Sequence, residues 1–177
     1  MRDSLLRLIP EFDLIGDPTL REKTLGVWEK ALRLGNWVVD DLERIPFTLM
    51  IPDTSINFKD HVQGVTRVSI KVADVLSEVY GDKMTINKDY LIAGALLHDV
   101  GKLLEYTKEK GKFIKSREGI FLRHPFSGVG LCFGEGIPDE VLHIIAVHSK
   151  EGEGYRHSAE AIIIHYADFI NFELFRL

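Results

Sequence analysis

One stretch of this chain limits its fold more than any other: an apolar run from Tyr90 to Leu97 leads directly into the doublet His98-Asp99. The run is typical of a buried helix, because apolar residues occupy nearly every face of it. An imidazole and a carboxylate at the end of such a helix are costly to remove from water unless each has a partner. A divalent metal ion resolves that cost, since both groups are good ligands for it. Adjacent helical positions point about 100° apart, so the doublet can reach two metals, or one metal from two sides.

The residues after the doublet fit the same interpretation. Gly101 allows the chain to leave the helix, and Lys102 follows one turn past His98 on the same face. Taken alone, the stretch also fits a simpler interpretation, in which the dipole of a helix C-terminus favours the histidine and Asp99 is its surface partner. The choice depends on whether other residues of the chain could complete a metal site.

Composition restricts the class of protein. At 177 residues the chain is long enough for one domain, 1–177, and its 45% apolar and 28% charged residues are ordinary for a globular protein. The net charge of −5 argues against an extended nucleic-acid-binding surface, although a metal centre could still attract a nucleotide. The single cysteine excludes an internal disulfide. No uncharged apolar run reaches about 18 residues, so we expect no membrane span, no signal peptide and a cytoplasmic location.

Hydrophobic periodicity predicts helices on the N-terminal side of the doublet and through it. The first is expected from residue 18 to about residue 43. The second begins after Ser55 or Asn57, has apolar residues at spacings of three and four, and ends at Gly81. Asn87 is the expected N-cap of the helix that carries the doublet.

Beyond the doublet the pattern changes. Residues 103–115 are consistent with a short β-hairpin around a glycine turn. Helices are then expected over 126–133, after residue 138, and from about 158 to 172. The predicted architecture is therefore an all-α bundle with one short hairpin.

Polar residues that can bind a metal recur at the ends of these helices or inside them. They are His61, His98, Asp99, His124, His148 and Asp168. Each has an ordinary explanation by itself, such as a helix cap. A bundle in which successive elements each direct one ligand to a common centre would produce the whole set, so together they favour a metal site. His165 lies three residues before Asp168 and is a candidate second partner or minor ligand.

The order of these residues resembles the HD superfamily of metal-dependent phosphohydrolases, in the subset that has two histidines between the doublet and the terminal aspartate. Residues 97–102 (LHDVGK) match the HDxGK signature of that family, and residues 124–128 (HPFSG) resemble its HPxxG segment. The resemblance spans about residues 57–172 and leaves 1–56 as an N-terminal helical extension. It implies an all-α HD-domain bundle.

The resemblance also implies a binuclear centre. His61, His98, Asp99 and Asp168 would bind one ion, and Asp99 would bridge to a second ion held by His124 and His148. A mixed histidine and aspartate set suits Fe, Mn, Co, Ni or Zn. Two such ions about 4 Å apart generate hydroxide near neutral pH, which would attack phosphorus. Asp99 and Lys102 are then the candidate catalytic residues, and Lys102 and Lys150 the candidate substrate contacts.

The expected function is hydrolysis of a phosphate mono- or diester in a nucleotide or related small molecule. Two alternatives stay open: an HD-type diiron oxygenase, and a regulatory module without turnover, which the intact ligand set disfavours. The segment from His148 to Tyr155 matches the cyclic-dinucleotide HD-GYP branch poorly, because Ser149 and Arg156 replace the expected histidine and proline. The apolar tail 169–177 could pack on its own domain or on a second copy, so a homodimer is also open.

Overall fold

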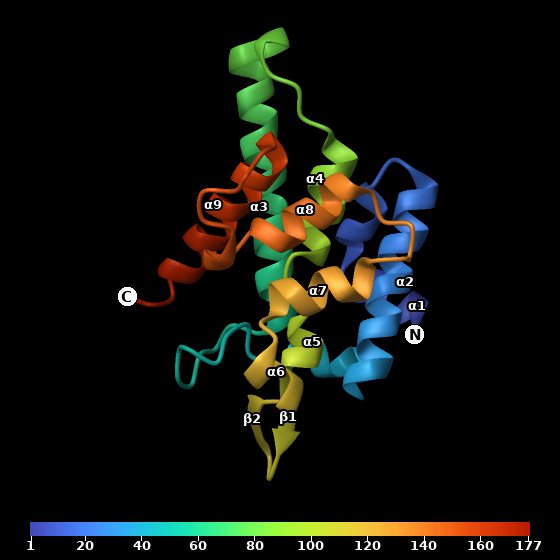
Figure 1. The fold of residues 1–177 in the computed structure, drawn as a ribbon, viewed down its shortest axis with the longest axis vertical. Coiled ribbons are helices and arrows are strands. Elements are labelled where there is room, and N and C mark those ends of the chain that lie inside the picture. The colour runs from blue at the N-terminus through green and yellow to red at the C-terminus, as the bar shows by residue number, and fades with distance from the viewer.

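The computed structural model describes residues 1–177, and almost all of its regular structure is helical (Figure 1). The helices are α1 (Arg2–Leu8), α2 (Pro18–Gly35), α3 (Phe58–Tyr80), α4 (Lys88–Leu97), α5 (Lys102–Glu105), α6 (Arg117–Phe121), α7 (His124–Cys132), α8 (Asp139–Val147) and α9 (Ala159–Glu173). Short 3-10 helices cover Pro10–Leu14, Val39–Glu43, Gly81–Lys83 and Lys150–Gly152. Strands β1 (Tyr106–Glu109) and β2 (Lys112–Lys115) form the antiparallel hairpin. The all-α prediction with one hairpin is confirmed.

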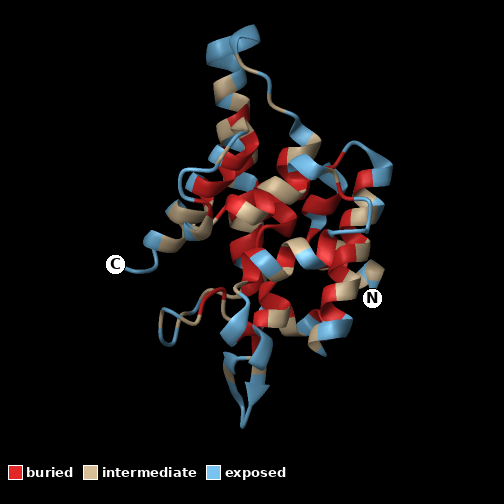
Figure 2. Ribbon diagram, viewed as in Figure 1, coloured by how far each residue is buried: buried red, intermediate tan, exposed pale blue.

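Helix α4 lies at the centre of the bundle. It packs against α2, α3, α8 and α9, and its residues from Leu91 to Leu97 are all buried. Figure 2 shows that buried residues gather where these helices meet, while the hairpin and the far end of α3 are exposed. A helix surrounded in this way can be apolar on every face, as its sequence predicted. The end of α4 is therefore deep inside the molecule, where the doublet follows.

Side-chain caps explain where several of these helices begin. Asn57 accepts a hydrogen bond from the Asp60 amide, and Asn87 accepts one from the Tyr90 amide, as predicted. Ser158 caps α9 in the same way. These caps fix the starts of α3, α4 and α9, three of the helices that carry or lead into the polar residues described below.

Two tryptophans from the N-terminal segment brace the turn that carries the doublet. The indole N–H of Trp28 donates to the carbonyl oxygen of Leu96 at 3.0 Å, and that of Trp37 donates to Leu103 at 2.8 Å. Both bonds are buried, and the two carbonyls stand on either side of the doublet. Satisfying buried carbonyls at a helix end stabilises the local backbone. The N-terminal segment is thus part of the structure that holds the doublet in place.

Helix α2 is shorter than the periodicity predicted, because it ends at Gly35 rather than near Glu43. Asn36 adopts the left-handed conformation with φ of 57°, which stops an α-helix. A Cβ on Gly35 would lie 2.1 Å from the Leu103 carbonyl oxygen, so the close approach requires glycine. The apolar residues after the break continue the pattern in a 3-10 helix, and periodicity alone does not reveal the interruption.

Two further boundaries differ from expectation. Helix α7 begins at His124, two residues earlier than predicted, because Pro125 fits the first turn of a helix. The one-turn helix α6 was not predicted, since five residues are too few to show a period. No helix of the chain is both long enough and apolar enough to cross a bilayer.

Candidate metal centre

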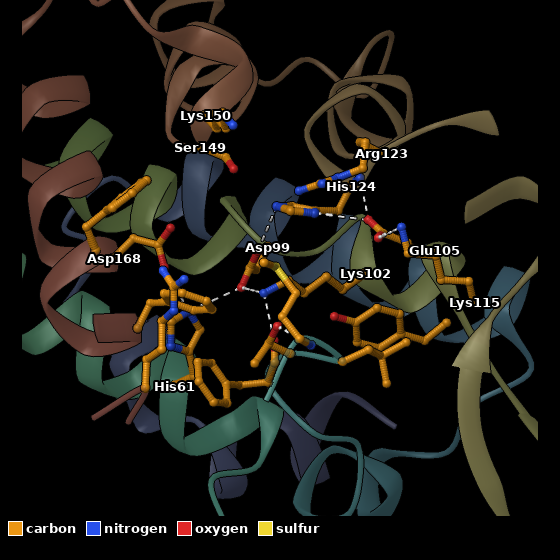
Figure 3. A pocket seen from close by; sticks show the side chains of 18 of the residues that line it. His61, Asp99, Lys102, Glu105, Lys115, Arg123, His124, Ser149, Lys150 and Asp168 are labelled. Carbon is orange, nitrogen blue, oxygen red and sulfur yellow. Dashed lines mark hydrogen bonds and ion pairs between the residues drawn. The ribbon is translucent and has the colours of Figure 1, made fainter. Parts of the chain in front are cut away.

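Five elements bring the predicted polar residues to one centre, and four of these residues, His61, Asp99, His124 and Asp168, also line a cavity. His61 comes from the first turn of α3, and His124 is the first residue of α7. His98 and Asp99 follow α4, His148 follows α8, and Asp168 lies inside α9. Figure 3 shows His61 and Asp168 on one side of Asp99, and His124 on the other. The structure brings all six side chains together, with Asp99 in the middle.

One oxygen of Asp99 faces the first cluster. The Oδ2 atom of Asp99 lies 3.2 Å from His61 Nε2 and 3.4 Å from His98 Nε2. Asp168 Oδ1 lies 3.1 Å from His61 Nε2 and 4.0 Å from His98 Nε2. The Nε2 atoms of His61 and His98 are buried and have no hydrogen-bond partner. Buried polar atoms are rarely left unpaired, so two of them aimed at carboxylate oxygens fit a cation between these groups.

The other oxygen of Asp99 faces the second cluster. The Oδ1 atom of Asp99 lies 3.3 Å from His124 Nε2 and 3.7 Å from His148 Nε2. The two Nε2 atoms of His124 and His148 are 3.3 Å apart. Each carboxylate oxygen of Asp99 thus faces a different pair of histidines. That division is the geometry a bridging carboxylate needs between two ions.

Hydrogen bonds at Nδ1, the ring nitrogen that faces away from the centre, fix the orientation and tautomer of two of the imidazoles. The Nδ1–H of His98 donates to the Ala95 carbonyl at 2.6 Å, and that of His148 donates to the Ile145 carbonyl at 2.8 Å. A carbonyl can only accept, so Nδ1 carries the proton and Nε2 keeps its lone pair toward the centre. Two lone pairs that face each other at the His124–His148 distance repel unless a cation lies between them. The donor set therefore fits a divalent transition metal.

Glu105 holds His124, and no sequence motif indicated this role. Its Oε2 atom accepts the backbone N–H of His124 at 2.7 Å and the Nδ1–H at 3.0 Å. One carboxylate oxygen thereby fixes both the first turn of α7 and the tautomer of its first side chain. The only local signal was an acidic residue among apolar neighbours, between Leu104 and Tyr106.

The pKa values of both carboxyl groups and of His124 are shifted in the direction that suits metal binding, whereas for His61 the lowering by burial is outweighed by Asp168 and Asp99, which raise its pKa. Burial opposes ionisation of Asp99, but the charges of Lys102 and His98 outweigh it and hold the pKa of that carboxyl well below its usual range. Asp168 behaves similarly, with burial outweighed by His61, so its pKa is also lowered. Burial lowers the pKa of His124 to about 4, although Glu105 acts in the opposite direction. Ionised carboxylates and a neutral imidazole are the forms that ligate metals.

The ammonium group of Lys102 is bonded to two groups of the protein itself. Its Nζ lies 2.5 Å from Asp99 Oδ2 and donates to the Phe47 carbonyl at 2.7 Å. The start of α7 packs so closely on Gly101 that a Cβ there would lie 2.1 Å from the His124 carbonyl oxygen. Helix α4 ends at Leu97, and Lys102 is the first residue of the short helix α5, consistent with the expected exit from the helix near Gly101. Its ammonium is directed to Asp99 and to the 47–50 segment.

His165 lies behind the centre and does not face into it. Its Nδ1–H donates to the backbone carbonyl of His148 at 2.6 Å, and its Nε2 accepts from Arg156 at 3.0 Å. It therefore supports the backbone that carries His148. His143 has a structural contact elsewhere, because its Nε2 accepts a hydrogen bond from the backbone N–H of His157 at 3.0 Å.

The cavity beside the clusters has a volume of about 470 Å³. It is large enough for a small organic ligand as well as a phosphate. One part of its lining is charged or polar, and another is apolar. The lining residues used below are Phe47, Leu49, Met50, Lys102, Arg123, Lys150, Phe169, Phe172, Glu173 and Arg176.

The fold and the site together indicate the class of protein. This is a helical domain in which one buried carboxylate faces two pairs of histidines, an arrangement suited to binding metal ions. The model of the HD domain family matches residues 59–171, and the chain belongs to that family. The family prediction made from the doublet and the later histidines is confirmed.

One relative adds a more specific comparison. The chain is 33% identical over 174 residues to a dihydroneopterin 2',3'-cyclic phosphate phosphodiesterase of Methanocaldococcus jannaschii. The match covers 92% of this chain and 66% of that relative. The chain therefore spans just under two thirds of the relative's length. No solved structure matched the chain.

Proposed function

We propose that this protein is a metal-dependent phosphohydrolase that cleaves a phosphodiester bond in a small molecule. The observation that carries the proposal is the position of Asp99, whose Oδ1 and Oδ2 face different pairs of histidines. A phosphodiesterase activity also fits the relative that is 33% identical, and a cyclic phosphodiester is the bond class its name specifies. The sequence predicted hydrolysis of a phosphate mono- or diester, and the relative favours the diester.

The proposed ligand sets follow the two clusters. His61, His98, Asp99 and Asp168 would hold one divalent ion; Asp99, His124 and His148 would hold the other. Bound there, such ions supply Lewis acidity and lower the pKa of water toward neutrality. The chain contributes pre-oriented nitrogens and a carboxylate that stays ionised at neutral pH. This arrangement requires no Ser, Thr or Cys nucleophile.

Two cations other than Lys102 are placed to hold the phosphoryl oxygens. Lys150 lines the cavity, is exposed, and forms no ion pair within the chain. Arg123 also lines it, 3.4 Å from Glu151, and its Nε has no hydrogen-bond partner. Figure 3 shows Arg123 beside His124, and Lys150 beside Ser149. Charge-assisted donors in these positions would neutralise charge that develops on phosphorus-bound oxygens.

Lys102 then has a positioning role. Its ammonium balances the charge of Asp99 and ties the 47–50 segment to the centre through the Phe47 carbonyl. We therefore assign it the task of orienting Asp99, whereas the resemblance implied that it would face the phosphate. Its third donor remains free for a phosphoryl oxygen.

The test combines metal analysis with turnover. Untagged protein is analysed for bound metals, reloaded with each metal found, and assayed on bis(p-nitrophenyl) phosphate and on 2',3'-cyclic nucleotides. We expect hydrolysis that chelator abolishes and metal restores, and loss of metal in His98→Ala. His143→Ala is the matched control, because that histidine lies outside the centre. Oxygen consumption by iron-loaded protein without phosphodiester cleavage would refute the hydrolase proposal in favour of oxygenase chemistry.

A further inference from the structure

The cavity has an apolar wall that the chemistry at phosphorus does not need. The wall is built by two segments, the loop residues Phe47, Leu49 and Met50 and the α9 residues Phe169 and Phe172. A phosphate ion alone would occupy only a fraction of about 470 Å³. Ligand cavities of several hundred Å³ typically bury most of an organic molecule against apolar and aromatic side chains. The remainder of the cavity is thus available to the organic part of a substrate.

The position of the wall relative to the metal centre follows from α9. Phe172 comes four residues after Asp168, so both lie on the same face of the helix, about 6 Å apart along its axis. Phe169 is three residues before Phe172 and belongs to the same stripe. A group attached to a phosphate by a sugar or a short carbon chain would reach this distance. The wall therefore stands where the organic part of a phosphate ester would lie.

Packing within the wall keeps it in place, while its residues Met50, Phe169 and Phe172 stay partly open. The buried ring of Phe47 lies 6.1 Å from the Phe172 ring and 4.9 Å from the His61 ring, measured between centroids. Phe169 and Phe172 are only partly buried, and Met50 is 70% exposed. Exposed apolar side chains that adjoin a cavity commonly mark a ligand surface.

We propose that this wall binds a flat heteroaromatic ring of the substrate, so that the substrate class is a phosphodiester that carries such a ring. This inference rests on the proposed phosphodiesterase function for the placement of the phosphate. Aromatic rings stack on Phe faces, and a thioether such as that of Met50 adapts to a ring edge. Glu173 and Arg176 also line the cavity, where Arg176 Nη1 lies 3.4 Å from Glu173 Oε1; the remaining carboxylate oxygen and guanidinium donors could bond the polar edge of a heterocycle.

Two substrates with the same reacting group separate the ring from the phosphate. 2',3'-cyclic GMP and glycerol 1,2-cyclic phosphate both present a five-membered cyclic phosphodiester, but only the first carries a heteroaromatic ring. In Phe169→Leu, Phe172→Leu and Met50→Ala, we expect kcat/KM for the nucleotide to fall by about tenfold each, and that for the glycerol compound to stay within about twofold. Met50 is so exposed that its replacement leaves the fold intact. Phe133→Ala, which removes an aromatic ring 74% exposed and outside the cavity lining, is the control.

A binding measurement keeps this proposal separate from the phosphodiesterase proposal. Guanosine and neopterin, which lack phosphate, are titrated into wild-type protein by calorimetry; we expect binding that weakens by about tenfold in Phe172→Leu. If neither ring compound binds wild-type protein, or if the variants lower turnover of both cyclic phosphates equally, the ring site is wrong. If the rings bind as expected but no cyclic phosphate is hydrolysed, the ring site stands and the proposed function fails.

Discussion

Glu105→Gln is the most informative perturbation of the second cluster, because Glu105 contacts the His124 ring at Nδ1, the nitrogen that faces away from Asp99. Its other carboxylate oxygen lies 3.5 Å from Lys115 Nζ. The carboxylate Oε2 accepts two hydrogen bonds from His124, at 2.7 and 3.0 Å. A hydrogen bond to a charged group contributes about 1.5–3 kcal/mol, and a neutral one about 0.5–1.5 kcal/mol. Glutamine keeps one acceptor oxygen but loses the charge, so we expect a loss of about 1–2 kcal/mol. That corresponds to a roughly five- to thirtyfold weaker ion at His124.

Calorimetric titration of metal-free protein measures this effect directly. We expect two binding steps in wild-type protein and a selectively weakened second step in Glu105→Gln. Glu105→Ala should weaken it further, because the buried His124 N–H then has no acceptor. Glu109→Gln is the control, because Glu109 is an exposed glutamate of strand β1, four residues after Glu105. Two unchanged steps in both Glu105 variants would show that Glu105 does not position a metal ligand.

Three further predictions concern the centre itself. Asp99→Ala should remove most bound metal and lower the free energy of unfolding by about 3–5 kcal/mol, since it leaves Lys102 buried without its partner; metal analysis and denaturant unfolding check both. His124→Ala should retain about one ion per chain and lose turnover, with His143→Ala as control, and normal hydrolysis would indicate a mononuclear site. Lys102→Met should lower the melting temperature of metal-free protein, whereas Arg123→Met should raise KM for a phosphodiester by about tenfold at unchanged melting temperature. If instead Lys102→Met raised KM and Arg123→Met lowered the melting temperature, Lys102 would be the residue that binds the phosphate.

The residues that converge on the centre could be located from the sequence because local chemistry marks each of them. A histidine such as His148 at the end of an apolar helix contrasts with its neighbours, and a cap such as Asn57 or Asn87 fixes where the helix begins. Helix ends alone therefore indicated which side chains share an environment. The family resemblance supplied the pairing among them.

The contacts that complete the site are not visible in the sequence, because they join distant segments. Glu105 reaches His124 across the hairpin and α6, and no spacing rule relates them. The hydrogen bond from Lys102 to the Phe47 carbonyl depends on the path of the loop between α2 and α3, and that loop has no hydrophobic periodicity from which its path could be predicted. The end of α2 at Gly35 depends on the approach of another backbone, not on propensity. The apolar wall near Phe172 likewise exists only once α9 and the loop meet.

The tryptophan brace described above also gives the chain an optical probe. Trp28 and Trp37 are its only two indoles, and each indole N–H is bonded to a carbonyl next to the His98-Asp99 turn. Indole emission shifts with the electric field and hydrogen bonding at the ring. A rearrangement of this turn when ions bind would therefore change the intrinsic fluorescence of the protein without any added label. Metal loading could then be followed in real time by light that is absorbed and emitted next to the doublet itself.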